Sequence, residues 1–405
     1  MKILVIGGGG REHALCWKIA QSKGVEVIAS PGNPGMARIG KCVPLEQAEE
    51  LRPDLTVVGP EAPLVEGIVD RFRARGWPIV GPDREAARLE GSKAFAKSFM
   101  RQSGIPTAGF ATVDSPDEAR KVLDRFGFPL VLKADGLAAG KGVTIAHDRV
   151  EAEAALAAGG PLTGRIVVEE FLRGTEISFI ALCDGRDAIP LQPSQDHKAV
   201  FDGDLGPNTG GMGAYCDGSL LTAAQTREIL ERVIYPTVEA TGFTGFLYAG
   251  LMMTESGPKV LEFNVRLGDP ETQPLMHRML SDFVPALAAA AAGEMGDVEL
   301  DWRAEPSVCV VMASGGYPGK FEAGKTIRGI EEAEAVGATV FQAGTRIGSG
   351  GLETAGGRVL GVTASGSDLG KAVERAYAGV AKIRFEGMHF RSDIGKRGGR
   401  KPATG

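Results

Sequence analysis

Cysteine is scarce in this chain, and its arrangement excludes two common uses of the residue. The 405 residues include five cysteines and five histidines. The cysteines are odd in number and never stand at C-x-x-C spacing, which is typical of a reduced protein without disulfides or a zinc ribbon. No two histidines stand at metal-site spacing, so the sequence also argues against a zinc enzyme.

Long apolar runs and an excess of positive charge are also missing. The opening stretch MKILVIGGGG has an apolar run, but glycines end it too early for a signal peptide, and no window approaches a membrane span. The formal net charge of −6 argues against a general surface for nucleic acid or membrane. We therefore expect a cytoplasmic protein, without nucleic-acid or membrane partners, that holds an anionic ligand by local clusters of charge.

Glycine, by contrast, is abundant. The chain contains 58 glycines, about twice the usual share, without a collagen-like period. Glycine allows tight turns and close approach of the backbone to a ligand, so this surplus indicates ligand loops.

The order of predicted strands and helices divides the chain into three units. Residues 1–103 alternate β-rich runs with helical patterns, which predicts an α/β unit with a doubly wound parallel sheet. Residues 104–297 predict an α+β module with antiparallel strands, in which a mobile lid occupies about 115–190. Residues 298–405 predict a small α+β unit with a basic tail. In the middle unit we expect a long helix over 222–241 and an Ala-rich helix over 271–292.

The stretch GGGGREHA follows a predicted strand and opens a helix, so its backbone N–H groups would face an anion. A dinucleotide site fits poorly, because Glu12 stands where a third glycine belongs and the second strand carries no ribose-binding acid. A phosphate-bearing small substrate at Gly9 and Gly10 is the favoured interpretation. Plain packing in a tight turn is the alternative.

Two lysines flank a loop of small residues in VLKADGLAAGKGV. This is not the G-x-x-x-x-G-K-[ST] phosphate loop, because Val143 follows Gly142. Lys133 ends a predicted strand and Lys141 lies in the loop, where two ammonium groups could cover a triphosphate. A hairpin turn with surface lysines is the alternative.

Acids interrupt an apolar strand in VVEEFLRGTE. The end of such a strand can offer backbone groups to an adenine, and Glu176 could accept hydrogen bonds from ribose hydroxyls. Solvated glutamates at Glu169 and Glu170 are the structural alternative.

The stretch LEFNVRLGDPE predicts a metal site. On a strand, Glu262, Asn264 and Arg266 share one face. Carboxylate and amide oxygens are hard ligands suited to Mg²⁺, and the arginine suits a phosphoryl or carboxylate oxygen. A salt-bridged edge strand is the alternative.

Acids, a base and glycines are concentrated in QDHKAVFDGDLGPNTGGMGAY, residues 195–215. This composition favours a loop that shapes a substrate site. His197 is a candidate general base, but a hydrogen-bond donor that positions the substrate is favoured.

Taken in order, these motifs resemble the ATP-grasp ligases, and among them the phosphoribosylamine–glycine ligase family of purine biosynthesis. The resemblance runs through nearly the whole chain and includes LEGSKAFAK, GIPTA, GPNTGGMGAY and LEFNVRLGDPETQ. It implies ligation of glycine to 5-phosphoribosylamine, with ATP consumed and glycyl phosphate as the intermediate. It also implies a glycine loop that folds over the triphosphate, and a monomer or weak homo-oligomer.

The resemblance further implies roles for individual residues. Mg²⁺ or Mn²⁺ would lie at Glu262 and Asn264, and Arg266 and Lys198 would act on the transferred phosphoryl group. The ATP contacts would be Lys93, Lys133, Gly140, Lys141, Gly142, Glu169, Glu170, Leu172 and Glu176. The glycine and phosphoribosylamine contacts would be Gly9, Gly10, Asp202, Asn208 and Gly211.

The sequence departs from the family pattern at two places. Many ATP-grasp relatives carry a second acidic metal ligand about a dozen residues before the E-x-N pair, where this chain reads FLYAGLMM. Ala199 also stands where a basic residue is expected. Another ATP-grasp ligase, a carboxylase or a nucleotide sensor without catalysis are the competing hypotheses. No biotin-accepting M-K-M segment occurs, and the combination of Lys133, Glu262, Asn264 and Arg266 argues against a mere sensor.

Overall fold

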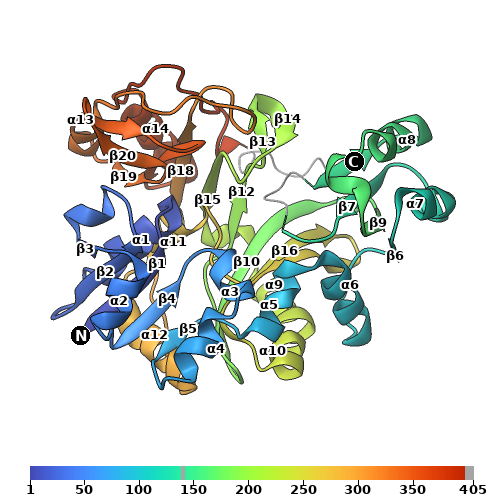
Figure 1. The fold of residues 1–405 in the computed structure, drawn as a ribbon, viewed down its shortest axis with the longest axis horizontal. Helices are drawn as coiled ribbons and strands as arrows, with labels where there is room; N and C mark the ends of the chain where they lie inside the picture. Colours follow the sequence, from blue (N-terminus) through green and yellow to red (C-terminus); the bar gives the residue numbers. More distant parts are fainter. Residues whose placement is uncertain (138–141, 397–405) are drawn as a thin grey trace.

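The first part of the chain folds around a parallel sheet, as predicted. The computed structural model describes residues 1–137 and 142–396. Five parallel strands pair in the order β3-β2-β1-β4-β5 (Figure 1). Their bounds are β1 Lys2–Gly7, β2 Glu26–Pro31, β3 Lys41–Cys42, β4 Leu55–Val58 and β5 Ile79–Val80. The helices of this part are α1 Gly10–Ile19, α2 Leu45–Glu50, α3 Glu61–Val65, α4 Ile68–Arg73, α5 Arg84–Gly91 and α6 Lys93–Gln102.

Near-continuous apolar sequence in β1 reflects burial on both faces of this sheet. Ile3 and Val5 belong to a core cluster that includes Phe283 from α12 (Phe283–Ala292), far along the chain. Leu4 and Ile6 belong to a second cluster on the other face. The core of the first unit therefore includes side chains from the middle of the chain, and this packing holds the two parts together.

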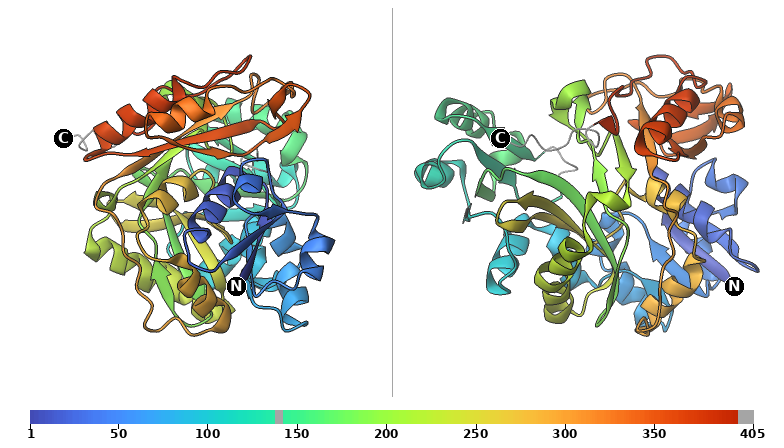
Figure 2. Two further views of the ribbon diagram at one scale, coloured as in Figure 1. Left: turned by 90° about the vertical axis from the view of Figure 1, so that its left-hand side faces the viewer. Right: turned by 180° about the vertical axis from the view of Figure 1, so that it is seen from behind.

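A four-stranded antiparallel sheet, called the small sheet below, stands apart from the rest (Figures 1 and 2). Its order is β6-β9-β7-β8, and a separate apolar cluster packs it against two helices. The elements are β6 Phe110–Val113, α7 Pro116–Val122, β7 Leu130–Ala134, β8 Val143–Ala146, α8 Arg149–Ala157 and β9 Ile166–Glu170. The predicted hairpin is present, because Lys133 pairs with Val143 in the β7–β8 ladder.

A nine-stranded sheet, called the large sheet below, runs through the middle of the molecule. Its order is β17-β16-β10-β12-β15-β18-β22-β19, with β11 on β10, so strands from the last hundred residues continue the central sheet. The bounds are β10 Thr175–Asp184, β11 Ala188–Pro190, β12 Ser194–Asp196, β15 Gly213–Cys216, β16 Thr244–Thr254, β17 Gly257–Asn264, β18 Ser307–Ala313, β19 Thr339–Gln342 and β22 Arg358–Ser365.

The remaining elements decorate this sheet. Two small hairpins are β13 Ala199–Phe201 with β14 Leu205–Asn208, and β20 Thr345–Gly348 with β21 Gly351–Thr354. The last helices are α13 Ile330–Ala335 and α14 Leu369–Val380. Among the described residues, no helix is both long and apolar enough to cross a membrane.

Two helix predictions are modified by local chemistry. The helix expected over 222–241 forms as α9 (Ala223–Ile229) and α10 (Tyr235–Thr241) with a π-helical segment between them. Pro236 cannot donate a hydrogen bond inside a helix, and a wider turn accommodates the loss. The single helix expected over 271–292 is wrong: Met279 is extended and Asp282 caps a new helix, α12, after α11 (Thr272–Arg278).

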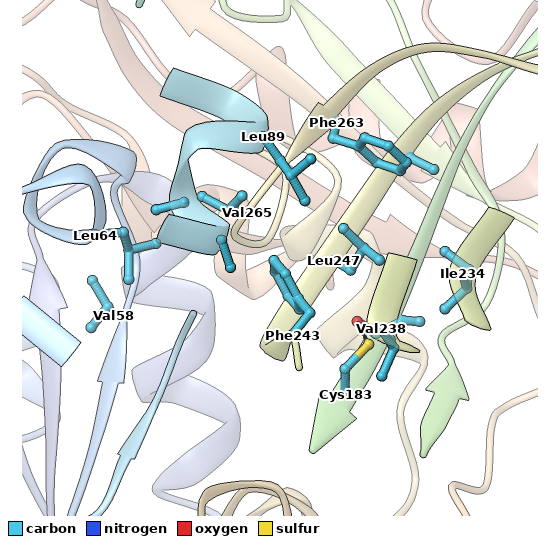
Figure 3. Packing of buried hydrophobic residues seen from close by; sticks show 14 of the residues in the cluster. Val58, Leu64, Leu89, Cys183, Ile234, Val238, Phe243, Leu247, Phe263 and Val265 are labelled. Carbon is cyan, nitrogen blue, oxygen red and sulfur yellow. Dashed lines mark hydrogen bonds between the residues drawn. The ribbon is translucent and has the colours of Figure 1, made fainter. Parts of the chain in front are cut away.

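Apolar side chains join the N-terminal unit to the large sheet. Figure 3 shows Val58, Leu64 and Leu89 converging on Val265 and on residues of the β16 and α10 region. Val265 directly follows β17, so this packing fixes the strand that carries the predicted metal ligands.

Candidate active site

A cavity of about 620 Å³ lies where the N-terminal unit, the small sheet and the large sheet meet. Its lining includes thirteen of the predicted site residues, which are Gly9, Lys93, Lys133, Gly142, Glu169, Glu170, Leu172, Glu176, Lys198, Asn208, Glu262, Asn264 and Arg266. Gly10, Asp202 and Gly211 lie outside the lining. Gly140 and Lys141 fall outside the described residues.

Strand β17 brings the predicted metal ligands to the cavity. Glu262 and Asn264 alternate along the strand and therefore face the same side. Burial opposes ionisation of Glu262, but the charges of Lys198, Lys133 and others outweigh it and lower the pKa of this carboxyl. The carboxylate accepts no hydrogen bond within the described part of the chain, so its oxygens are available to a cation.

Arg266 is held by two carboxylates from the N-terminal unit. Its Nη2 lies 2.8 Å from Glu90 Oε1, and its Nε lies 3.3 Å from Glu61 Oε2. Arg266 Nη2 also donates to Asn264 Oδ1 at 3.2 Å, and Glu90 Oε2 accepts from the backbone N–H of Val265 at 2.8 Å. Neither Glu61 nor Glu90 was predicted from the sequence, although Glu90 lies in the LEGSKAFAK motif.

Lys133 belongs to a buried triad. Glu169 Oε2 lies 3.1 Å from Lys133 Nζ and 3.0 Å from Lys97 Nζ. Lys133 also donates to the carbonyl of Leu261 at 3.0 Å, which ties β7 to β17. Burial and the neighbouring charges leave the pKa of Lys97 lowered to about 8. Lys97 was missed, although its spacing of four from Lys93 puts both lysines on one face of α6.

Lys93 connects α6 to the loop that follows β7. Its Nζ donates to the carbonyl of Gly136 at 2.7 Å, while Ser92 and the N–H of Ala94 hold the neighbouring Asp135. Burial lowers the pKa of Lys93, and Glu262 counteracts part of that effect. These contacts hold the ammonium of Lys93 at the cavity, close to the end of β7.

Lys198 lies in a wall of the cavity rich in carboxylates. It forms an ion pair with Glu176. Burial disfavours the ammonium charge, but Asp196 and Glu176 outweigh that cost and raise the pKa of Lys198. Further along the wall, Glu271 Oε1 accepts from Tyr248 at 2.9 Å and from Ser178 at 3.1 Å. The sequence analysis did not single out Glu271 or Tyr248.

His197, the candidate base, points elsewhere. It is fully buried, its ring lies 6.3 Å from that of Tyr215, and it is absent from the cavity lining. The alternation of strand residues explains this, because Asp196 and Lys198 face the cavity on either side of it.

The Gly7–Gly10 turn is filled by the protein's own carboxylate. Glu12 Oε2 accepts from the N–H of Gly9 at 2.7 Å, and Glu12 Oε1 lies 2.5 Å from Arg11 Nε. A Cβ at Gly59 would stand 2.0 Å from Glu12 Oε1, so glycine there makes room for the acid. The Glu12 side chain thus satisfies the N–H of Gly9 at the start of α1, and Gly9 itself has no side chain to complete a capping box.

The stretch from 199 to 211 divides between the cavity and the end of the chain. Asn208 lines the cavity, whereas Asp202 accepts a hydrogen bond from the N–H of Ser392 at 2.8 Å. The buried Arg391 lies 3.0 Å from Asp204 Oδ1. Arg358 of β22 donates to the carbonyl of Gly210 at 2.5 Å and also lines the cavity.

Two antiparallel sheets that face each other across a lysine-lined cavity are the arrangement of the ATP-grasp ligases, and this chain is a member of that class. Sequence profiles of phosphoribosylglycinamide synthetase match it in three parts: the N domain at residues 1–90, the ATP-grasp (A) domain at 91–272 and the C domain at 307–397. The chain belongs to the phosphoribosylglycinamide synthetase, or phosphoribosylamine–glycine ligase, family.

Individual relatives agree with this assignment. The chain is 49% identical over 420 residues to the phosphoribosylamine–glycine ligase of Pseudomonas aeruginosa, covering 98% of each chain. It is 49% identical over 422 residues to that of Escherichia coli O6:H1, again covering 98% of each. The crystal structure of the Thermotoga maritima phosphoribosylamine–glycine ligase superposes with a TM-score of 0.85 at 37% identity, covering 97% of this chain and all of that one.

Proposed function

We propose that the cavity joins glycine to 5-phosphoribosylamine in two steps within purine biosynthesis. A carboxylate oxygen of glycine attacks the γ-phosphorus of ATP, the bond to the bridging oxygen breaks, and glycyl phosphate and ADP form. The amine nitrogen of phosphoribosylamine then attacks the acyl carbon, phosphate leaves, and the nitrogen loses a proton to give glycinamide ribonucleotide. The observation that carries the residue assignments is the meeting of Lys133, Arg266 and the free carboxylate of Glu262 in one cavity.

ATP lies between the two sheets in this proposal. Lys93 and Lys133 bind the phosphates, the strand end from Glu169 to Leu172 binds the adenine, and Glu176 binds the ribose. One oxygen of Glu169, Oε1, is buried and accepts no hydrogen bond, which supports a role in recognising the base. Gly142 lines the cavity and contacts the triphosphate in this proposal, and the resemblance implies the same contact for Gly140 and Lys141, which lie outside the described residues.

The donor set on β17 fits Mg²⁺ or Mn²⁺. Glu262 supplies a carboxylate without a hydrogen-bond donor, and Asn264 supplies an amide oxygen on the same face. Within the described residues no group of three or more His, Cys, Asp or Glu side chains suits a metal, so phosphate and water oxygens would complete the shell. When bound, such a cation neutralises charge on the transferred phosphoryl group.

Arg266 and Lys198 are the catalytic residues of the proposal. Both are cations at the cavity surface, and both can stabilise charge that develops on the phosphoryl oxygens during transfer. Glu61 and Glu90 hold the Arg266 guanidinium in place, so little reorganisation is needed at the moment of reaction.

Phosphoribosylamine binds towards the N-terminal unit in this proposal. Gly9 and Asn208 support it because they line that part of the cavity. Gly10 stabilises the same turn, while Asp202 and Gly211 shape the segment that carries Asn208. We further propose a cytoplasmic protein that is a monomer or a weak homo-oligomer. Its domains would be residues 1–103, 104–297 and 298–405, with a lid at about 115–190. The basic tail from residue 397 lies outside the described residues.

The decisive test is ADP release by the purified protein with Mg-ATP and glycine, with and without freshly made phosphoribosylamine. Release that requires both co-substrates supports the proposal. Turnover with a different amine would keep the mechanism and discard the substrate. If no amine led to ADP release although ATP bound, the protein would be a nucleotide-binding protein without ligase activity.

A further inference from the structure

The carboxylates that line the cavity differ in whether the protein itself satisfies them. Within the described residues, all but two accept a hydrogen bond or lie in an ion pair with a neighbouring side chain or backbone N–H. The satisfied acids are Glu12, Glu61, Glu90, Glu169, Glu170, Glu176, Asp269 and Glu271. The two exceptions are Glu262, already assigned to the cation, and Asp196.

Asp196 is buried but not satisfied. It is the last residue of β12, its relative exposure is only 8%, and it lines the cavity. Lys198 is the cation that interacts most strongly with Asp196, but its ammonium forms its ion pair with Glu176. A buried carboxylate without a donor is costly, so its presence beside an open cavity indicates a cationic ligand.

The surroundings of Asp196 strengthen the case for a cation. Lys198, Glu271 and Glu176 all interact electrostatically with it. Lys198 thus serves two carboxylates at once, Asp196 and Glu176, while a third, Glu271, is fixed nearby by Tyr248 and Ser178. A second positive charge in this wall would offset the excess negative charge.

Glycine is a zwitterion, so its site must present a cation and an anion side by side. Lys198 and Asp196 stand two residues apart and both reach the cavity, which matches that requirement. We propose that the carboxylate of Asp196 binds the α-ammonium group of glycine. The carboxylate of glycine then faces Lys198 and Arg266. This assignment rests on the proposed function. It also implies that the enzyme selects a carboxylic acid with an adjacent primary ammonium over one without it.

Steady-state kinetics of four proteins test the assignment: the unmodified enzyme, Asp196→Asn, Asp196→Glu and the control Asp187→Asn. Asp187 makes the control a matched one, because it is an exposed aspartate at the far end of the neighbouring strand pair, between β10 and β11. We expect Asp196→Asn to raise the KM for glycine about 100-fold while the KM for ATP changes less than about twofold. Asp196→Glu restores part of the loss, and Asp187→Asn has no effect.

Three results would overturn the assignment. They are an unchanged KM for glycine in Asp196→Asn, equal rises in the KM values for glycine and ATP, and a loss that added Mg²⁺ fully repairs, which would make Asp196 a metal ligand. Should the variants fail to fold, calorimetric binding to the unmodified enzyme with Mg²⁺ and a non-hydrolysable ATP analogue decides the question. Acetate must then bind at least about 100-fold more weakly than glycine, and equal binding refutes an ammonium site. An unmodified enzyme that shows no turnover would instead refute the proposed function.

Discussion

The turn at Gly7–Gly10 and strand β17 both bring a glutamate to the same cavity, yet they use it in opposite ways. Glu12 is enclosed by the N–H of Gly9 and the guanidinium of Arg11. Glu262 lies among lysines but accepts no hydrogen bond within the described part of the chain. The carboxylate of Glu12 therefore stabilises the fold, whereas the oxygens of Glu262 remain available to a ligand. A charged residue in a cavity is therefore informative only when its partners are known.

The largest effect is expected at β17. Glu262→Gln removes the anionic ligand but keeps the shape, so kcat should fall about 10³-fold, or about 4 kcal/mol of transition-state stabilisation. The free energy of unfolding should fall less than in Glu12→Gln, since the lysines around Glu262 stabilise its charge without a direct ion pair. ADP release and urea denaturation measure the two quantities. Glu255→Gln, on the exposed turn of the same hairpin, is the matched control, and equal losses in both variants would contradict the prediction.

Glu12→Gln should give the opposite result. It breaks a buried ion pair and leaves Arg11 without its carboxylate, so the free energy of unfolding should fall by about 3 kcal/mol. Activity should fall much less than in Glu262→Gln, when both are measured at a temperature where the variant is folded. If Glu12→Gln instead abolished turnover in a stable protein, the Glu12 carboxylate itself would act on a ligand and the contrast would fail.

Glu90→Gln tests whether Arg266 must be held in place. The variant loses the charge that orients the guanidinium, so we expect kcat to fall about 100-fold with little change in the KM for ATP. Glu90→Asp should recover activity only in part, because the shorter side chain cannot reach both Arg266 and the N–H of Val265. Normal turnover in Glu90→Gln would show that Arg266 needs no support.

Low pH should weaken the contact between the N-terminal unit and the last strands. Burial lowers the pKa of His13 to about 4, and the N–H of Gln342 donates to its Nδ1 at 2.7 Å. Because the unfolded chain binds a proton more readily, the stabilisation is complete above pH 6.5 and is lost as pH falls towards 4. At pH 5 the loss is about 2 kcal/mol. His13→Gln should reduce the slope of this part of the curve in urea denaturation, and the remaining slope should come from His277, whose pKa burial also lowers to about 4.

The smallest effect is expected at Asp202. Its hydrogen bonds to Ser392 anchor the β13–β14 hairpin, so Asp202→Asn should cost less than about 1 kcal/mol of stability and raise the KM for phosphoribosylamine only a few-fold. Ser392→Ala should do the same. A much larger rise for Asp202→Asn alone would show direct contact with the substrate.

Local sequence patterns were enough to predict the class of fold and the family of the chain. The β-α-β rhythm predicted the parallel sheet, and the strand period predicted that Glu262 and Asn264 share one face of β17, since both patterns are local consequences of backbone geometry. Arg266 reaches the same cavity from beyond the end of that strand. The structure confirmed the β7–β8 hairpin for the same reason. The helix expected over 271–292 failed because a local cap at Asp282 and the extended Met279 overrode the apolar composition.

Which charged side chains have protein partners could be learned only from the folded arrangement of the chain. Glu61, Glu90 and Lys97 were missed, and Asp196 was not assigned a role, because their partners come from distant parts of the chain. Asp202 and Ser392 are hydrogen-bonded although they lie 190 residues apart in the sequence, so no local sequence pattern predicts the contact. Motifs show which side chains are present. Whether a carboxylate stabilises the fold or remains available to a ligand depends on its burial and its partners, and both are fixed only when the chain folds.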